Sequence, residues 1–242
     1  MMEYDHRGTH MTAATTEPVA ESPAAELETF ADIARRLGDI PPDRIIWLPH
    51  RATEDDCVRY CERHGPVELI DGFLVEKGMG YRESLLAAAL IRLIGNFVVP
   101  RKLGLVGGPD AIMRVSADQL RLPDVSFVTW ERLLATDAHN KKVAPFGPDL
   151  AVEVLSDRNT RAEIDQKRRE FFGAGTKLIW VIDRKTRTAE VYDDPTRPNQ
   201  MTLVRETDAL DGGAVLPGFV LPLAELFGDL EPPAPNTTPD TN

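Results

Sequence analysis

Two acidic residues stand in apolar segments of this chain, and a lysine follows them. Asp124 begins an apolar run directly after Leu122 and Pro123, and Glu153 lies in a second apolar run 29 residues later. Lys167 comes 14 residues after Glu153, inside a helical pattern. Charged side chains are rarely buried unless they are paired or bind a metal. These residue types therefore suggest a divalent metal ion and a phosphate ester.

The chemistry that such a group favours is phosphodiester hydrolysis. This reaction needs an activated water, and it needs balancing charge on the transition state and on the leaving oxygen. Mg²⁺ prefers oxygen ligands and keeps several of its waters, so two protein carboxylates suffice to hold it; Mn²⁺ is the alternative ion. Asp124 and Glu153 supply the carboxylates if their strands are neighbours. Lys167 can orient the water or stabilise negative charge if its helix packs back across those strands.

The elements around these residues are predicted from apolar periodicity and from turn and cap residues. Asp71-Gly72, between two apolar runs, is the strongest hairpin signal. Thr53 is expected to cap one helix, and Ser156 and Asn159 the helix after Glu153. Helices are expected over residues 26–37, 53–64, 81–99 and 161–174. Strands are expected over 67–70, 73–75, 103–107, 111–115, 124–128, 150–155, 178–182 and 189–192, with short edge strands at 201–204 and 214–216. This mixture predicts an α/β or α+β sheet domain.

Composition predicts a single folded domain between two polar ends. We expect a disordered leader over residues 1–25, a domain with an N-terminal helical extension over 26–229, and a disordered proline-rich tail over 230–242. No run of 18 apolar residues and no secretory signal is present, which favours a cytoplasmic location without a membrane segment. Cys57 and Cys61, four residues apart in a predicted helix, are expected to stay reduced.

Several motifs together resemble one bacterial family. They are Val67-Glu68-Leu69-Ile70-Asp71-Gly72, the segment 122–128 around Asp124, the segment 148–156 around Glu153, then Lys167, Gly175 and Leu178-Ile179-Trp180-Val181-Ile182-Asp183. In this order and spacing, the chain resembles the Uma-type putative restriction endonucleases of the PD-(D/E)XK nuclease superfamily. The resemblance implies a restriction-endonuclease-like core, in which a central mixed sheet is flanked by helices.

The resemblance also implies roles for single residues. Asp124 and Glu153 fall on metal-ligand positions, with the carbonyl of Val154 as a further ligand. The superfamily's usual lysine position, two residues after the glutamate, is Leu155 here. The family takes its lysine from the following helix instead, and Lys167 is the match. Glu83 lies at the start of a helix where many relatives carry histidine. The resemblance implies that Glu83 is a metal ligand and a catalytic residue. Asp110 matches a further acidic position.

Each of these residues also has an ordinary structural interpretation. Asp124 can be a turn acid, Glu153 an outward-facing residue of an edge strand, and Lys167 a solvated helix lysine paired with Glu163 at i, i+4. Glu83 can be an acid in the first helical turn, where the helix dipole favours a negative charge, and Asp110 can be a turn residue after Gly107-Gly108-Pro109.

Three functional hypotheses remain open from the sequence. The first is a Mg²⁺-dependent endonuclease that acts on DNA, with a homodimer left open. The second is a catalytically inactive nuclease-fold module that binds or regulates. The net charge of −11 favours the second, because nucleic-acid binding normally shows a basic footprint. The third is a nuclease-fold enzyme that acts on another phosphate substrate.

Overall fold

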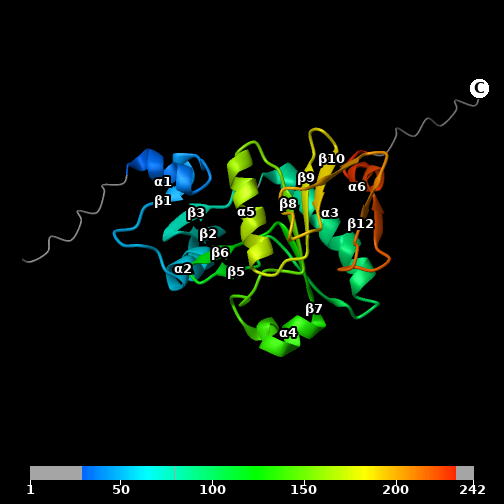
Figure 1. Cartoon of the computed structure of the whole chain (residues 1–242), viewed down its shortest axis with the longest axis horizontal. Helices are drawn as coiled ribbons and strands as arrows, with labels where there is room; N and C mark the ends of the chain where they lie inside the picture. Colours follow the sequence, from blue (N-terminus) through cyan, green and yellow to red (C-terminus); the bar gives the residue numbers. More distant parts are fainter. Residues whose placement is uncertain (1–28, 79, 233–242) are drawn as a thin grey trace, which may run out of the picture.

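The computed structural model describes residues 29–78 and 80–232, and they form a mixed α/β fold (Figure 1). The predicted leader over 1–25 and the predicted tail from residue 233 onward lie outside the described residues. Two larger sheets stand on either side of helix α5 (Arg161–Gly173), and a two-stranded sheet lies at the C-terminal side (Figure 1). Helix α5, which carries Lys167, therefore runs between the two sheets.

The central sheet has six strands and is mixed, as the sequence predicted. Strands β8 and β9 pair in parallel, and every other neighbouring pair in this sheet is antiparallel. In spatial order the strands are β11 (Thr202–Arg205), β10 (Thr188–Tyr192), β9 (Leu178–Asp183), β8 (Leu150–Val154), β7 (Val125–Thr129) and β4 (Gly104–Gly107). The two strands beside the expected ligands, β7 and β8, are thus adjacent and interior.

The second sheet is smaller and is built around the predicted hairpin. Asp71 and Gly72 both have positive φ, +49° and +77°, which is the conformation of a two-residue type I′ turn. Ile70 pairs directly with Phe73 across this turn. In spatial order the strands are β1 (Ile45–Ile46), β3 (Phe73–Glu76), β2 (Val67–Ile70), β6 (Gln119–Arg121) and β5 (Met113–Ser116).

Helices cover both faces of the central sheet. The 18-residue helix α3 (Tyr81–Val98) packs its leucine face on one side together with α6 (Leu223–Gly228), and α5 packs on the other. Alternate residues of β8 follow this division, since Val152 lies in the α3 cluster and Ala151 in the α5 cluster. Within the described residues, no helix has the length and apolar character needed to cross a membrane. The other helical elements are α1 (Phe30–Arg36), η1 (Pro42–Arg44), α2 (Glu54–His64), α4 (Trp130–Thr136) and η2 (Ala138–Asn140).

Several local predictions were wrong. The segment 214–216 forms a turn, and the short strands β12 (Ala209–Asp211) and β13 (Val220–Pro222) lie on either side of it. Thr160 is the N-cap of α5, because its Oγ1 accepts the amide N–H of Glu163, so Ser156 and Asn159 do not cap that helix. Strand β6 and helices α4 and α6 were not predicted. Thr53 caps α2 as expected, and both cysteines are free.

Candidate active site

A layer of charged side chains, most of them buried, lies where α5 meets the two sheets. We call this layer the polar seam. Its members are Arg44, Glu68, Lys77, Arg121, Asp124, Glu153, Glu163, Lys167 and Glu170. Buried charges require partners, and here cations and carboxylates alternate across the seam. The seam is where the expected Asp124, Glu153 and Lys167 lie.

Asp124 and Glu153 face each other on the same side of the central sheet. Val125 pairs with Val152 in the antiparallel register of β7 and β8, so the residues one step outward, Asp124 and Glu153, are opposite. The amide N–H of Asp124 donates to the carbonyl of Val152 at 3.0 Å, so the chain stays hydrogen-bonded to β8 as far as Asp124. Opposite residues of an antiparallel pair point to the same face and lie close together. Both side chains are buried in an interior part of the sheet, which contradicts the alternative of Glu153 on an edge strand.

Lys167 is also buried, and its ammonium joins two carboxylates. Its Nζ lies 3.1 Å from Glu153 Oε2 and 3.1 Å from Glu68 Oε1. The side chain is only 3% exposed, so the solvated-lysine alternative is wrong, and no Glu163–Lys167 ion pair forms among these described residues. Burial opposes the charged form, but the two contacting carboxylates outweigh it and raise the pKa of Lys167 above its ordinary value. The lysine is therefore a fixed cation.

Glu153 has one carboxylate oxygen without a partner. Oε2 accepts from Lys167, whereas Oε1 is fully buried and has no hydrogen-bond partner among the described residues. Burial raises the pKa of Glu153 to about 7, and the nearby charge of Asp124 acts in the same direction, while Lys167 opposes both. A buried polar atom without a partner is uncommon and marks a position where a cation or a proton donor would be favourable.

Glu68 belongs to the site, although the sequence motif that contains it did not predict a role for this residue. It lies in β2 and is completely buried. Its Oε1 accepts the amide of Leu122 at 3.1 Å, and its Oε2 accepts from Arg121 Nη1 at 2.8 Å. Burial alone would raise the pKa of Glu68, but Lys167 and Arg121 overcome it and lower the value to about 2. The sequence signal that could have identified Glu68 is its position as the acidic residue in the otherwise apolar strand Val67–Ile70.

Lys77 is a second cation that the sequence reasoning missed. It lies in the connection between β3 and α3, and its Nζ is 2.9 Å from Asp124 Oδ1. The second oxygen of Asp124, Oδ2, accepts the amide N–H of Val154 at 2.6 Å. Both carboxylate oxygens of Asp124 are therefore engaged, in contrast to those of Glu153. Nothing in the spacing of Lys77 relative to Asp124 signals this contact.

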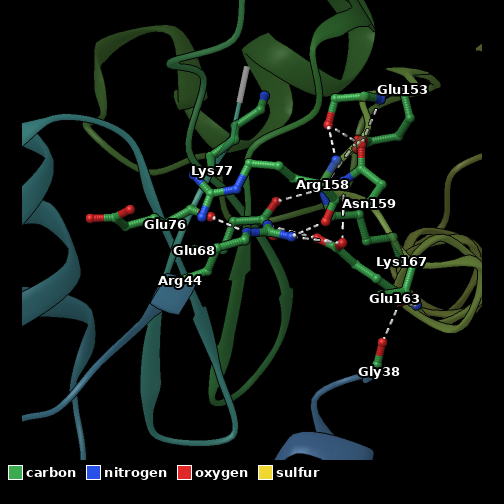
Figure 2. Close-up of polar contacts among 12 residues, drawn as sticks. Gly38, Arg44, Glu68, Glu76, Lys77, Glu153, Arg158, Asn159, Glu163 and Lys167 are labelled. Atoms are coloured by element: carbon green, nitrogen blue, oxygen red, sulfur yellow. Dashed lines mark hydrogen bonds and ion pairs between the residues drawn. The ribbon is translucent and has the colours of Figure 1, made fainter. Parts of the chain in front are cut away.

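A bidentate ion pair between Arg44 and Glu163 connects η1 to α5 in the seam (Figure 2). Figure 2 shows the guanidinium of Arg44 directed at the carboxylate of Glu163, and each of its Nη atoms donates to one carboxylate oxygen at 2.9 Å. Arg44 Nε donates to the carbonyl of Glu76, and Nη1 also donates to that of Arg158. Asn159 donates to Glu163 as well. These contacts tie α5 to the hairpin sheet and so fix the turn of helix that carries Lys167.

Of the other expected residues, Val154 contacts this group, whereas among the described residues Glu83 and Asp110 form no hydrogen bond or ion pair with it. Glu83 is partly exposed in the first turn of α3, and among the described residues it has no hydrogen bond or ion pair to Asp124, Glu153 or Lys167. Asp110 is exposed in the turn after Pro109. Val154 contacts Asp124 through its amide N–H.

The donor set fits a hard divalent cation that keeps most of its own waters. Within the described part of the chain, no group of three or more histidine, cysteine or acidic side chains is placed to hold a metal. The pair Asp124 and Glu153 nevertheless supplies two oxygen-bearing side chains on one face of the sheet, and Glu153 Oε1 is unpartnered. Mg²⁺ accepts such a site, because one or two carboxylates with waters are its usual protein ligands.

Comparison with known proteins agrees with this architecture. The family model Uma2, described as "Putative restriction endonuclease", matches residues 55–224. A solved structure from Anabaena variabilis, described as a putative nuclease belonging to DUF820, matches with a TM-score of 0.64 and 20% identity. The match covers 74% of this chain and 99% of that one, and at this identity it supports the fold alone. A search of curated proteins finds no match.

Proposed function

The chain belongs to the Uma2 family of putative restriction endonucleases, and from that premise we propose that it is a metal-dependent endonuclease that hydrolyses phosphodiester bonds in DNA. The observation that carries the proposal is the unpartnered, buried Glu153 Oε1 beside Asp124 and the fixed cation Lys167. A buried carboxylate oxygen with no donor is costly in a merely structural site. A role as a metal ligand explains why Glu153 Oε1 has no hydrogen-bond donor.

Each side chain has a separable part in the proposed reaction. Asp124 and Glu153 would hold Mg²⁺ or Mn²⁺, which supplies Lewis-acid stabilisation and lowers the pKa of a bound water. Lys167, fixed between Glu153 and Glu68, presents a permanent positive charge beside the reacting phosphate. Glu68 acts on the lysine rather than on the substrate, because Leu122 and Arg121 fix its carboxylate. Glu68 is thus proposed as a positioning residue.

A nicking assay on supercoiled plasmid DNA tests the proposal. The wild-type protein is expected to cut with Mg²⁺ or Mn²⁺ and to stop in EDTA. Asp124→Asn and Glu153→Gln remove one ligand charge each while preserving shape, and both are expected to lose cutting. Asp118→Asn and Glu131→Gln are matched controls, since both acids are exposed and outside the seam. If the wild type cuts with neither ion, or if the two ligand variants cut equally well, the assignment is wrong.

A second candidate is a nuclease-fold module without catalysis, and one observation favours it. Asp124 and Glu153 are each only 4% exposed and Lys167 only 2%, so the site is closed in this conformation. The net charge of −11 points the same way. Thermal unfolding with increasing Mg²⁺ separates the two candidates, because a functional metal site is stabilised by its ion. An unchanged melting temperature up to millimolar Mg²⁺ supports the module.

A further inference from the structure

The ammonium of Lys77 occupies the position beside Asp124 that a metal ion bound to this carboxylate would need. Its side chain is 4% exposed, although it extends from a loop connection and not from a core element. The ammonium contacts Asp124 Oδ1 at 2.9 Å, the carbonyl oxygen of Leu122 at 2.5 Å and that of Pro109 at 3.3 Å. The ammonium thus donates hydrogen bonds to two backbone carbonyls and forms an ion pair with one carboxylate.

This arrangement identifies Lys77 as a bound counter-ion. A lysine that acts on a substrate needs to reach it, whereas the Lys77 ammonium is buried against Asp124 and two backbone carbonyls of the protein itself. Lys167 differs, since the two oxygens that its ammonium contacts both belong to carboxylates of the seam, those of Glu68 and Glu153. Lys77 instead neutralises Asp124, whose other oxygen is held by the amide of Val154.

A divalent ion and the Lys77 ammonium oppose each other at the same carboxylate. Mg²⁺ binds carboxylate oxygens at about 2.0–2.1 Å, well inside the distance at which the ammonium now lies. Two cations that share one buried oxygen repel strongly, because little solvent screens them. Either the ion is excluded or the lysine leaves. The ammonium can leave because the lysine side chain is long and flexible, while the backbone amide N–H of Lys77 stays hydrogen-bonded to the carbonyl of Pro66.

We propose that Lys77 is an intramolecular competitor of the divalent ion: it holds Asp124 in the metal-free protein and is displaced when the ion binds. The proposal rests on the proposed function, since it assumes that Asp124 and Glu153 form the metal site. Its consequence is that metal affinity is set partly by a residue that is not a ligand. Removing the positive charge of Lys77 tightens metal binding, whereas removing a ligand weakens it.

Calorimetric titration of the full-length protein with Mn²⁺ at constant ionic strength tests the proposal. Lys77→Gln keeps hydrogen-bonding capacity without charge and is expected to bind Mn²⁺ about tenfold more tightly, which corresponds to ~1.4 kcal/mol. Lys77→Met is the second variant, in case one of the two fails to fold. Lys102→Met is the matched control, because Lys102 is exposed and lies outside the seam, and it leaves the affinity unchanged. Circular dichroism of each variant in EDTA verifies the fold.

The outcomes separate this inference from the proposed function. If the wild type binds Mn²⁺, Asp124→Asn abolishes binding, and neither Lys77 variant binds more tightly, the competitor role is wrong while the metal site stands. If wild type and Lys77 variants alike fail to bind, both proposals are wrong. If the Lys77 variants keep the wild-type affinity but lose cutting at saturating Mn²⁺, Lys77 acts on the substrate, and the competitor role is again overturned.

Discussion

Replacement of Glu153 by glutamine is expected to stabilise the metal-free protein while it destroys the proposed site. Glutamine has the shape of glutamate and no charge, and its side-chain oxygen can still accept from Lys167. Burial raises the pKa of Glu153 from its ordinary 4.5 to about 7. At ~1.4 kcal/mol per pH unit, ionising this group in the folded protein therefore costs ~3 kcal/mol of stability.

The sign of the pH dependence follows from where the proton resides. Between pH 4.5 and about 7, Glu153 stays protonated in the folded protein and ionises in the unfolded chain. Because the folded state binds more protons there, its stability falls as the pH rises through this window. Above pH 7 the full penalty is present. Glu153→Gln lacks this contribution, so its advantage over the wild type is large at pH 8 and small at pH 5.

Thermal unfolding in EDTA at pH 5 and pH 8 measures this difference. For a chain of this size ~3 kcal/mol corresponds to a melting temperature roughly 6–12 °C higher for Glu153→Gln at pH 8. Glu131→Gln, in an exposed first helical turn, is the control and should show no such pH-dependent difference. A Glu153→Gln protein that is less stable than the wild type at pH 8, or whose advantage is equal at both pH values, refutes the reasoning.

Two further predictions concern the elements that hold the site. Arg44→Met leaves the Glu163 carboxylate buried without its cation and is expected to cost ~3–5 kcal/mol, whereas Arg44→Met combined with Glu163→Leu should recover much of this loss, as measured by urea unfolding. A double variant as unstable as the single one would contradict this. Thr160→Ala removes the N-cap of α5 and should cost ~1 kcal/mol, with Thr160→Ser as the control that keeps the hydroxyl; equal stability of both variants would exclude a capping role.

The elements of the fold were predictable where one local signal dominates. The leucines of α3 recur at helical spacing, and Asp71-Gly72 adopts the left-handed conformations that its type I′ turn requires. Helix α4 was missed because it begins at Trp130, directly after β7 ends at Thr129, with no breaking residue between them. The segment 214–216 has strand-like residues, but it lies in the turn between β12 and β13.

The site was predictable only in part, because half of it depends on contacts between distant elements. Asp124, Glu153 and Lys167 stand out in their own segments, since each is a charge in or beside an apolar pattern. Glu68 lies 99 residues before Lys167, and its role follows only from the packing of the hairpin sheet against α5. Lys77 lies 47 residues before Asp124, in a connection whose path no local pattern predicts.

The charge of the whole chain is a poor guide to the charge of the seam. The seam holds the carboxylates of Glu68, Asp124, Glu153, Glu163 and Glu170 against the cations of Arg44, Lys77, Arg121 and Lys167. Its formal charge is thus −1, so almost all of the net −11 lies elsewhere in the chain. A divalent ion at Asp124 and Glu153 would bring the formal charge of the seam to +1 with Lys77 in place and to 0 once Lys77 is displaced as proposed. Attraction of a phosphate would then arise locally and only with the ion bound, while the acidic remainder of the chain opposes association at long range. Binding of DNA by this protein is therefore expected to depend on the divalent ion far more than on a permanent basic surface.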